Sequence, residues 1–182
     1  MDEKEALRER MRQLGRLNNE VDFSQEDQAT CRQVLDSALY RHCATLFAFF
    51  PIAGEVDITP VLNDAILARR LALPRTHRDG SLSFHTVTDL NGLQRGRYQI
   101  AEPAEGGVVV PGRGDLMLIP ALAYDRGHHR LGRGKGYYDR YLSQHNSVTT
   151  VGVCRSYQLV EEIPTETWDR MVDQVISCGI LY

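Results

Sequence analysis

The sequence predicts an α/β protein with a three-layer α/β/α architecture. Its centre is an open, mainly parallel β-sheet that carries helices on both faces. Continuous apolar runs at 44–50 and 115–120 are typical of strands that are buried on both faces. Amphipathic segments with helical spacing alternate with such runs along the chain. The length of 182 residues suits one domain, 1–182, and we expect residues 1–43 to be N-terminal helices packed on the sheet.

The two N-terminal helices are predicted from their apolar spacing and their first residues. Residues 2–20 place leucine and methionine side chains on one helical face. Asp2 and Glu5 have the spacing of a capping pair. Ser24 is expected to cap the second helix, with Asp27 in its first turn.

The middle of the chain alternates shorter elements. Thr59 and Pro60 are expected to open a helix with a cap and a proline in the first turn. Residues 88–114 are rich in glycine and charge and predict a long functional loop or a partly ordered flap. The other expected elements are strands at 71–74, 82–87, 148–154 and 172–178 and a helix at 136–142.

A ligand site is expected beyond the carboxyl ends of the strands, because open parallel sheets bind ligands there. Three segments follow predicted strands at this edge, namely 50–55, 124–138 and 155–158. We expect the site to be assembled from these segments.

The stretch Arg130-Leu-Gly-Arg-Gly-Lys-Gly-Tyr-Tyr-Asp139 is the strongest candidate for chemistry. Its alternating glycines let the backbone approach a ligand and expose N–H donors. Its cations lie beside those donors, and a helix that starts near Gly136 adds the positive end of its dipole. These features predict a polyphosphate site whose Asp139 holds Mg²⁺. The alternative is a mobile basic surface loop.

This loop is neither of the common nucleotide loops. A P-loop requires G-x-x-x-x-G-K-[ST], whereas Gly136 follows Lys135 and His129 stands in place of the first glycine. The glycines also run G-x-G-x-G, which does not match the dinucleotide fingerprint G-x-G-x-x-G.

Lys4, Arg8 and Arg12 are four residues apart and therefore form a basic row on the first predicted helix. One interpretation is a solvated face that pairs with Glu5 and Glu9. The other is a second clamp on the phosphates. The spacing leaves both interpretations open.

Composition limits the classes of binding partner that we expect for this protein. The formal net charge of −3 does not favour nucleic acid. The cysteines, at 31, 43, 154 and 178, form no C-x-x-C pair, which indicates reduced thiols in a cytoplasmic protein. No apolar run approaches 18 residues, and the N-terminus is not a secretory signal, so we expect no membrane partner. We expect a monomer with small-molecule substrates. Trp168 is expected to be a packing residue.

Pro120-Ala-Leu-Ala-Tyr-Asp125, followed by 130–139, resembles the signature of the 5-formyltetrahydrofolate cyclo-ligase family, also called 5,10-methenyltetrahydrofolate synthetases. The resemblance extends over nearly the whole chain but is patchy outside 120–139. It implies a sheet of the NagB/RpiA/CoA-transferase-like kind. No signature residue is missing, although Phe49-Phe-Pro-Ile52 is less typical and leaves the shape of the pterin pocket open.

The resemblance implies an ATP- and Mg²⁺-dependent enzyme that converts 5-formyltetrahydrofolate to 5,10-methenyltetrahydrofolate and releases ADP and phosphate. The formyl oxygen is a poor leaving group, so it first receives the γ-phosphoryl group, and N10 then attacks the formyl carbon. The alternatives are a non-catalytic paralogue that binds folate or nucleotide, an ATP-dependent ligase for another formyl or amide substrate, and a protein that binds RNA through the basic loop.

The resemblance also assigns residues to the nucleotide. Catalytic roles are implied for Arg130, Arg133 and Lys135, and we ourselves place Lys135 nearest to the transferred phosphoryl group. Nucleotide contacts are implied for Lys4, Arg8, Arg130, Leu131, Gly132, Arg133, Gly134, Lys135, Gly136, Tyr137 and Tyr138. Core packing is the alternative role for Tyr137 and Tyr138.

Folate and metal contacts are implied in the same way. Folate contacts are implied for Phe50, Glu55, Tyr98, Arg133, Gly134, Lys135, Gly136 and Tyr137. A carboxylate such as Glu55 suits the pair of donors on the pterin edge. The metal candidates are Asp139 and Asp169, and Asp169 is preferred to Asp173.

Overall fold

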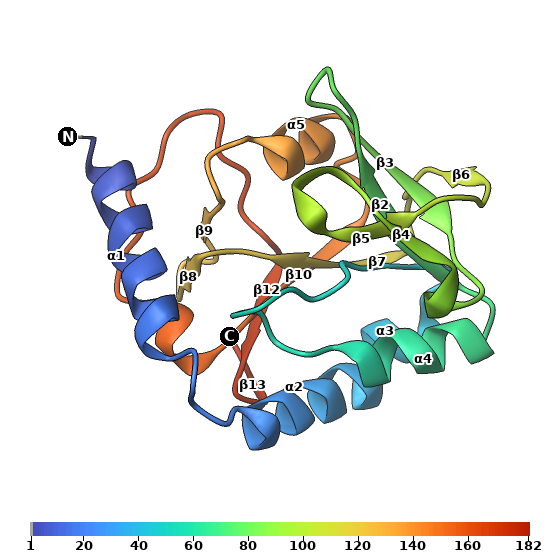
Figure 1. Cartoon of the computed structure of the whole chain (residues 1–182), viewed down its shortest axis with the longest axis horizontal. Coiled ribbons are helices and arrows are strands. Elements are labelled where there is room, and N and C mark those ends of the chain that lie inside the picture. The colour runs from blue at the N-terminus through green and yellow to red at the C-terminus, as the bar shows by residue number, and fades with distance from the viewer. Residues whose placement is uncertain (1) are drawn as a thin grey trace.

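The computed structural model describes residues 2–182 and is centred on an eight-stranded sheet (Figure 1). The strand order is β13-β12-β10-β7-β1-β2-β3-β6. Its parallel centre consists of β1 (Leu46–Phe47), β2 (Leu71–Thr76), β7 (Leu116–Pro120), β10 (Thr149–Cys154) and β12 (Gln174–Ser177). Antiparallel pairing adds β3 (Leu82–Thr86), β6 (Val108–Val109) and β13 (Ile180–Leu181) at the edges. The predicted open, mainly parallel sheet is confirmed.

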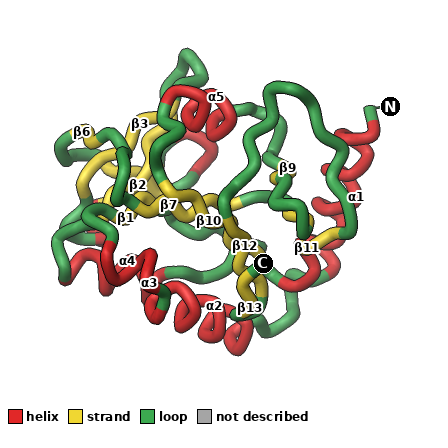
Figure 2. Tube along the Cα trace, turned by 180° about the vertical axis from the view of Figure 1, so that it is seen from behind, coloured by secondary structure: helices red, strands yellow, loops and turns green. Residues whose placement is uncertain are grey.

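Helices cover both faces of this sheet (Figure 2). On one face lie α2 (Ser24–Asp36), α3 (Ala38–His42) and α4 (Thr59–Leu67), and on the other lies α5 (Tyr137–Gln144). The two faces separate along β7, where Leu116 and Leu118 pack into the first core and Met117 and Ile119 into the second. This alternation explains why the strand is apolar at every position.

The helix α1 (Glu3–Leu17) lies away from the central sheet. It packs on a small sheet of β11 (Leu159–Val160), β8 (Ala123–Asp125) and β9 (Arg130–Leu131). Met11 meets Leu122, Leu131 and Ile163 in this separate core. The expected packing of 1–43 on the central sheet therefore describes α2 and α3 but not α1.

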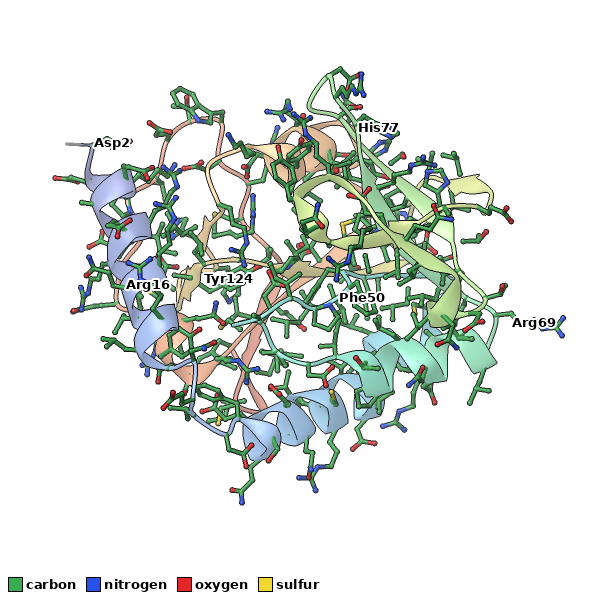
Figure 3. The ribbon with its side chains drawn as sticks, in the orientation of Figure 1. Asp2, Arg16, Phe50, Arg69, His77 and Tyr124 are labelled. Carbon is green, nitrogen blue, oxygen red and sulfur yellow. The ribbon has the colours of Figure 1, made fainter. Side chains whose placement is uncertain are left out.

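Tyr124 of β8, labelled in Figure 3, connects the small sheet to the central one. Its fully buried ring lies against Gly152 of β10, where an added Cβ would come within 2.5 Å of the ring. Its hydroxyl donates to the Ile119 carbonyl at 2.8 Å. The glycine loop, which follows β9, therefore starts from a fixed base.

The predicted long loop at 88–114 is partly wrong. It contains a hairpin of β4 (Leu93–Arg95) and β5 (Ala101–Pro103), flanked by the short 3₁₀ turn Leu90–Gly92 and joined by a second, Arg97–Gln99. At the tip, Tyr98 and Gln99 have left-handed φ values of 64° and 61°. The pattern failed because β4 is largely exposed and the buried positions of β5 are Glu102 and Pro103, so the pairing leaves no apolar alternation in the sequence.

Two of the predicted caps are displaced. Ser24 and Thr59 are the first helical residues of α2 and α4, and neither caps its helix with its side chain. Asp22 and Asp57 instead accept from the backbone N–H groups of Ser24 and Thr59, each at 2.9 Å. Asp2 does cap α1, because its side chain accepts from the backbone N–H of Lys4, in the first turn, at 3.2 Å. The predicted elements at 71–74, 82–87, 136–142, 148–154 and 172–178 correspond to β2, β3, α5, β10 and β12.

Candidate active site

A cavity of about 440 Å³, here called the basic cavity, lies where the glycine loop meets α1 and the segment before β12. These three parts of the chain are far apart in sequence but adjacent in Figure 1. The cavity brings together nine predicted residues, namely Lys4, Arg8, Arg130, Gly132, Gly134, Lys135, Gly136, Asp139 and Asp169.

The glycine loop turns back on itself through left-handed backbone. Gly134 and Gly136 have φ values of 93° and 65°, which side-chain-bearing residues rarely adopt. Gly136 is also the N-cap of α5, so the first N–H groups of this helix face the loop. Arg140 holds the turn closed, because it donates to the carbonyls of Lys135 and Gly80 at 2.9 and 2.7 Å.

Arg130 and Asp139 form an ion pair in the wall of the cavity, with 2.7 Å between Nη2 and Oδ1. Arg130 is buried, and its guanidinium lies 5.5 Å from the centre of the Tyr138 ring. Its Nε is buried without a hydrogen-bond partner among residues 2–182. A guanidinium in the wall of the cavity is well suited to an anionic ligand.

Lys4 and Arg8 extend the cavity from α1. Buried Lys4 pairs with Asp169 and, at 3.3 Å, with Glu166. Arg8 donates from Nε to the Gly132 carbonyl at 3.2 Å, so α1 is tied directly to the glycine loop.

Arg12 separates the two interpretations of the basic row. It pairs with Glu5 and Glu9 at 3.0 and 3.5 Å and does not line the basic cavity. Glu5 also pairs with Arg8, which explains why it is not used in a capping box. Arg12 thus belongs to the solvated face, whereas Lys4 and Arg8 lie at the site.

The acidic residues predicted as metal ligands do not all lie at the basic cavity. Asp139 and Asp169 both line the basic cavity. Asp173 instead accepts from the Thr150 backbone N–H and hydroxyl at 2.7 and 2.8 Å, which ties it to the start of β10. Within the described residues, no three acidic, histidine or cysteine side chains form a complete protein metal site. Two carboxylates in one cavity nevertheless fit Mg²⁺, which commonly takes one or two protein carboxylates together with substrate oxygens.

Arg133 does not line the basic cavity, in contrast to its sequence neighbours. Its Nη2 lies 3.0 Å from Oε1 of Glu55, and it borders a second cavity of about 450 Å³. The left-handed turn at Gly134 separates Arg133 from Lys135. Arg133 therefore lies apart from the other predicted phosphate-facing cations in this structure, and its contact with the nucleotide stays a prediction.

Glu55 lies in a closed environment and is only 8% exposed. Its Oε2 accepts from the Ile52 backbone N–H at 3.2 Å. Burial raises the pKa of the Glu55 carboxyl, and Arg133 opposes this shift. The arrangement holds the Glu55 carboxylate in a fixed position between Arg133 and the Ile52 backbone.

The remaining predicted residues surround the loop. Tyr98, at the hairpin tip, places its hydroxyl 3.3 Å from that of Tyr137. Phe50 is partly buried against the first core, and Tyr138 packs against the second. Leu131 is fully buried in the core beneath α1, so its side chain cannot face the cavity.

Several cavity residues were not predicted. They are Arg140, Ser143, Glu166, Trp168 and Arg170. The expectation that Trp168 is a packing residue is wrong, because its side chain is 66% exposed and lines the cavity. The only available sequence signal was its position next to Asp169.

The sequence and the fold are similar to those of known proteins. The sequence profile described as the 5-formyltetrahydrofolate cyclo-ligase family matches residues 1–178. The Escherichia coli 5-formyltetrahydrofolate cyclo-ligase is 34% identical over 140 residues, which cover 73% of this chain and 77% of that protein. The mouse 5-formyltetrahydrofolate cyclo-ligase is 27% identical, with 95% of this chain and 92% of that protein covered.

Solved structures give the same result. The NMR structure of Aquifex aeolicus 5,10-methenyltetrahydrofolate synthetase superposes with a TM-score of 0.84 at 28% identity, covering 98% of this chain and 91% of that one. The Mycoplasma pneumoniae 5,10-methenyltetrahydrofolate synthetase, at 24% identity and a TM-score of 0.73, supports the fold; 97% of this chain and 98% of that one are covered. No helix within residues 2–182 is long and apolar enough to span a bilayer. From the profile match and these relatives, this chain belongs to the 5-formyltetrahydrofolate cyclo-ligase family.

Proposed function

We infer that this protein is an ATP-dependent ligase that converts 5-formyltetrahydrofolate to 5,10-methenyltetrahydrofolate and releases ADP and phosphate. The observation that carries this inference, beside family membership, is the meeting of two unlike sites at one loop. A cavity lined by Lys4, Arg8, Arg130 and Lys135 lies on one side of Gly134. The buried Glu55 lies on the other side, held by Arg133.

The chemistry requires a better leaving group on the formyl carbon. The γ-phosphoryl group moves from ATP to the formyl oxygen, N10 of the folate attacks the formyl carbon, and phosphate then departs with that oxygen. N10 is already close to the carbon within the same molecule, so proximity lowers the second barrier. The protein therefore has to align the γ-phosphate with the formyl oxygen and neutralise the charge that develops during transfer.

The basic cavity supplies the nucleotide side. Lys135 and Arg130 provide charge, and Gly132, Gly134 and Gly136 let the backbone come close to the phosphates. We place Lys135 nearest to the transferred phosphoryl group, because it is exposed and no acid is hydrogen-bonded to it in the described chain. Arg130 instead stays buried in the wall beside Asp139.

The Glu55 side supplies the folate contacts. A carboxylate matches the 2-amino and N3–H donors of the pterin with two parallel hydrogen bonds. Tyr98 and Tyr137 meet above the loop and would cover the substrate from the hairpin. Arg133 then contacts Glu55 and the folate rather than the outer phosphates.

Asp139 and Asp169 are the residues that would hold Mg²⁺. Each now pairs with a cation, Arg130 and Lys4 respectively. When bound, the ion would neutralise phosphate charge. The arrival of a metal and a polyphosphate together would give both acids and both cations new partners of opposite charge.

The test is turnover by the purified protein with ATP, Mg²⁺ and 5-formyltetrahydrofolate, followed by the near-UV absorbance of the methenyl product. Product that requires all three components supports the inference. Binding of both ligands without product would indicate a non-catalytic paralogue, and ADP release that needs another formyl or amide acceptor would indicate a different ligase. A monomer in the cytoplasm stays a prediction.

A further inference from the structure

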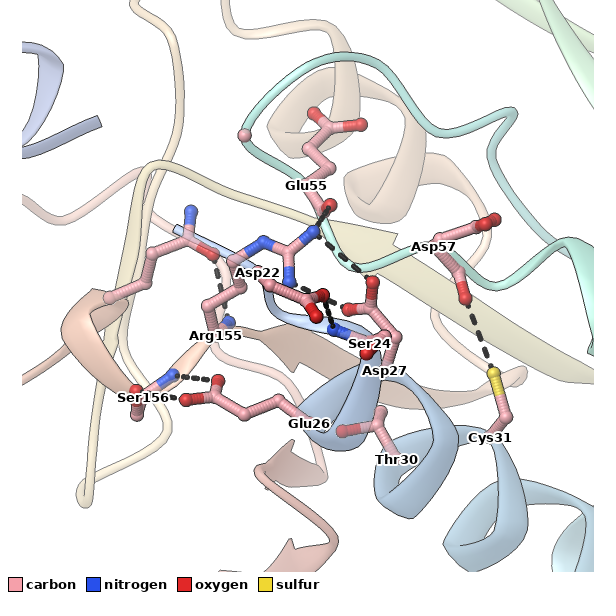
Figure 4. Close-up of polar contacts among 12 residues, drawn as sticks. Asp22, Ser24, Glu26, Asp27, Thr30, Cys31, Glu55, Asp57, Arg155 and Ser156 are labelled. Atoms are coloured by element: carbon pink, nitrogen blue, oxygen red, sulfur yellow. Dashed lines mark hydrogen bonds and ion pairs between the residues drawn. The ribbon is translucent and has the colours of Figure 1, made fainter. Parts of the chain in front are cut away.

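Arg155 connects the β10 end of the sheet to the loop that carries Glu55. It follows β10 directly and is 8% exposed. Its Nη1 lies 2.7 Å from Oδ1 of Asp27, and its Nη2 lies 3.3 Å from Oδ2 of the same residue. The same Nη2 donates to the backbone carbonyl of Glu55 at 2.6 Å (Figure 4).

The guanidinium of Arg155 is fixed from several directions. It lies 4.3 Å from the centre of the Phe23 ring, just before α2. The next residue, Ser156, donates from its backbone N–H and its hydroxyl to Glu26 at 3.0 and 2.6 Å. The first turn of α2 therefore grips the end of β10 through two adjacent acids, and Figure 4 shows Arg155 between that turn and Glu55.

The backbone of the Glu55 loop receives few other side-chain hydrogen bonds. Tyr157 donates to the Gly54 carbonyl at 3.2 Å, and the loop closes on itself between Glu55 and Ile52. Arg155 is the charged side chain that reaches the backbone of Glu55 itself. A hydrogen bond from a charged donor is stronger than one between neutral groups, so this contact has a large share in fixing the backbone at Glu55.

We propose that Arg155 is a positioning residue for folate: held by Asp27 and Phe23, it fixes the backbone of Glu55 so that the carboxylate is placed to receive the pterin. The proposal rests on the proposed function, because it takes Glu55 as the folate contact. It differs from a purely structural role in one respect. A structural clamp would affect both substrates alike, whereas a positioning residue for Glu55 affects folate and spares the nucleotide.

The variant that tests this is Arg155→Lys, which keeps a positive charge beside Asp27 but loses the fork that spans Asp27 and the Glu55 carbonyl. The expected result is a Kd for 5-formyltetrahydrofolate about tenfold higher, from the loss of one charge-assisted hydrogen bond. The Kd for ATP with Mg²⁺ should change by less than about twofold. Arg32→Lys is the matched control, because Arg32 is an exposed arginine of α2, the helix that carries Asp27. It should change neither the Kd for folate nor the Kd for ATP.

A double-mutant cycle with Glu55→Gln adds a readout that a structural role would not move. If Arg155 acts through Glu55, the lysine variant should weaken folate binding by less than about threefold in the Glu55→Gln background. A full tenfold loss there, or equal losses for folate and ATP in the single variant, would overturn the proposal.

Asp27→Asn provides a second way to loosen the same guanidinium and decides the matter if Arg155→Lys does not fold. It should weaken folate binding selectively, and unchanged folate affinity would overturn the proposal. The wild-type protein separates the two levels of inference. Failure of the wild type to bind 5-formyltetrahydrofolate would refute the proposed function and this proposal together, whereas normal wild-type binding with no effect of either variant would refute only the role of Arg155.

Discussion

The two sides of the glycine loop handle charge in opposite ways. In the basic cavity the cations are buried and their acid partners are more exposed, as in the pairs of Arg130 with Asp139 and of Lys4 with Asp169, whereas Glu55 is a buried acid whose partner Arg133 is half-exposed. On the other side, the carboxylate of Glu55 is closed in by Arg133 and Ile52. The first arrangement can exchange partners when a charged ligand arrives, and the second is already set for one. The comparison suggests that nucleotide binding rearranges the wall of its site, whereas folate enters a site that is largely formed.

The largest expected effect separates the two sides through catalysis. Lys135→Met should lower turnover at least about 100-fold, the scale of losing one contact to charge that develops in the transition state. The folate Kd should stay within about twofold, because Lys135 lines the basic cavity and not the Glu55 side. Product absorbance and direct folate binding measure the two quantities. Arg113→Met, at an exposed loop position, is the control, and near-normal turnover in Lys135→Met would contradict the assignment.

The matching change on the folate side is Glu55→Gln. The amide keeps the shape but loses the charge that the pterin donors need, so the folate Kd should rise about tenfold or more. The ATP Kd should change little, since Glu55 does not line the basic cavity. Titration calorimetry with each ligand gives both values. Equal weakening of both ligands would remove the distinction between the two sides.

The assignment of Asp169, and not Asp173, to the metal site predicts a smaller effect, and substitution of each acid tests it. Asp169→Asn should raise the Mg²⁺ concentration needed for half-maximal ATP binding by about tenfold, because a carboxylate ligand is lost. Asp173→Asn should leave that concentration unchanged and lower the free energy of unfolding by about 1–2 kcal/mol, because it weakens the bonds to Thr150. Emission of Trp168, the single tryptophan and a cavity residue, can follow nucleotide binding. The reverse pattern would move the metal site to Asp173.

The smallest expected effect is a pH dependence confined to the folate side. Glu55 must be ionised to accept the pterin donors, and burial raises the pKa of its carboxyl above the ordinary 4.5. Folate affinity should therefore fall as the pH drops toward this raised pKa, and the fall should begin at a higher pH than the protonation of an ordinary glutamate. Folate titrations across mildly acidic pH measure this, and the Glu55→Gln variant should lose the dependence. A wild-type profile that is flat down to pH 4.5 would show that Glu55 does not titrate as its burial implies.

Much of the site could be predicted because its main part is continuous in sequence. The glycines and cations of 130–139 indicate anion binding by themselves, and the structure places most of them on one cavity. Position along the chain cannot predict a side chain's direction after a left-handed turn. For this reason Arg133, which lies beside Glu55, was grouped with Lys135, which lines the basic cavity.

Contacts between residues that are distant in sequence were harder to predict, in the fold and in the site. Lys4 and Asp169 are separated by 165 positions, and no local pattern indicates that they meet. The buried strands were predicted because burial on both faces leaves a continuous apolar signal, as in β7. The β4–β5 hairpin leaves no such signal, because β4 is largely exposed and the buried residues of β5 are Glu102 and Pro103. The role of Arg155 was foreseen only as a position at the ligand edge, because its partners Asp27 and Glu55 come from distant segments.

The central claim is that the backbone of the glycine loop binds the triphosphate, and the backbone amide resonances of Gly132, Gly134 and Gly136 test it most directly. Addition of a non-hydrolysable ATP analogue with Mg²⁺ should shift these three resonances strongly, while the amide of Gly92, in the distant 3₁₀ turn, stays in place. Loop resonances that remain unmoved under saturating nucleotide would contradict the account.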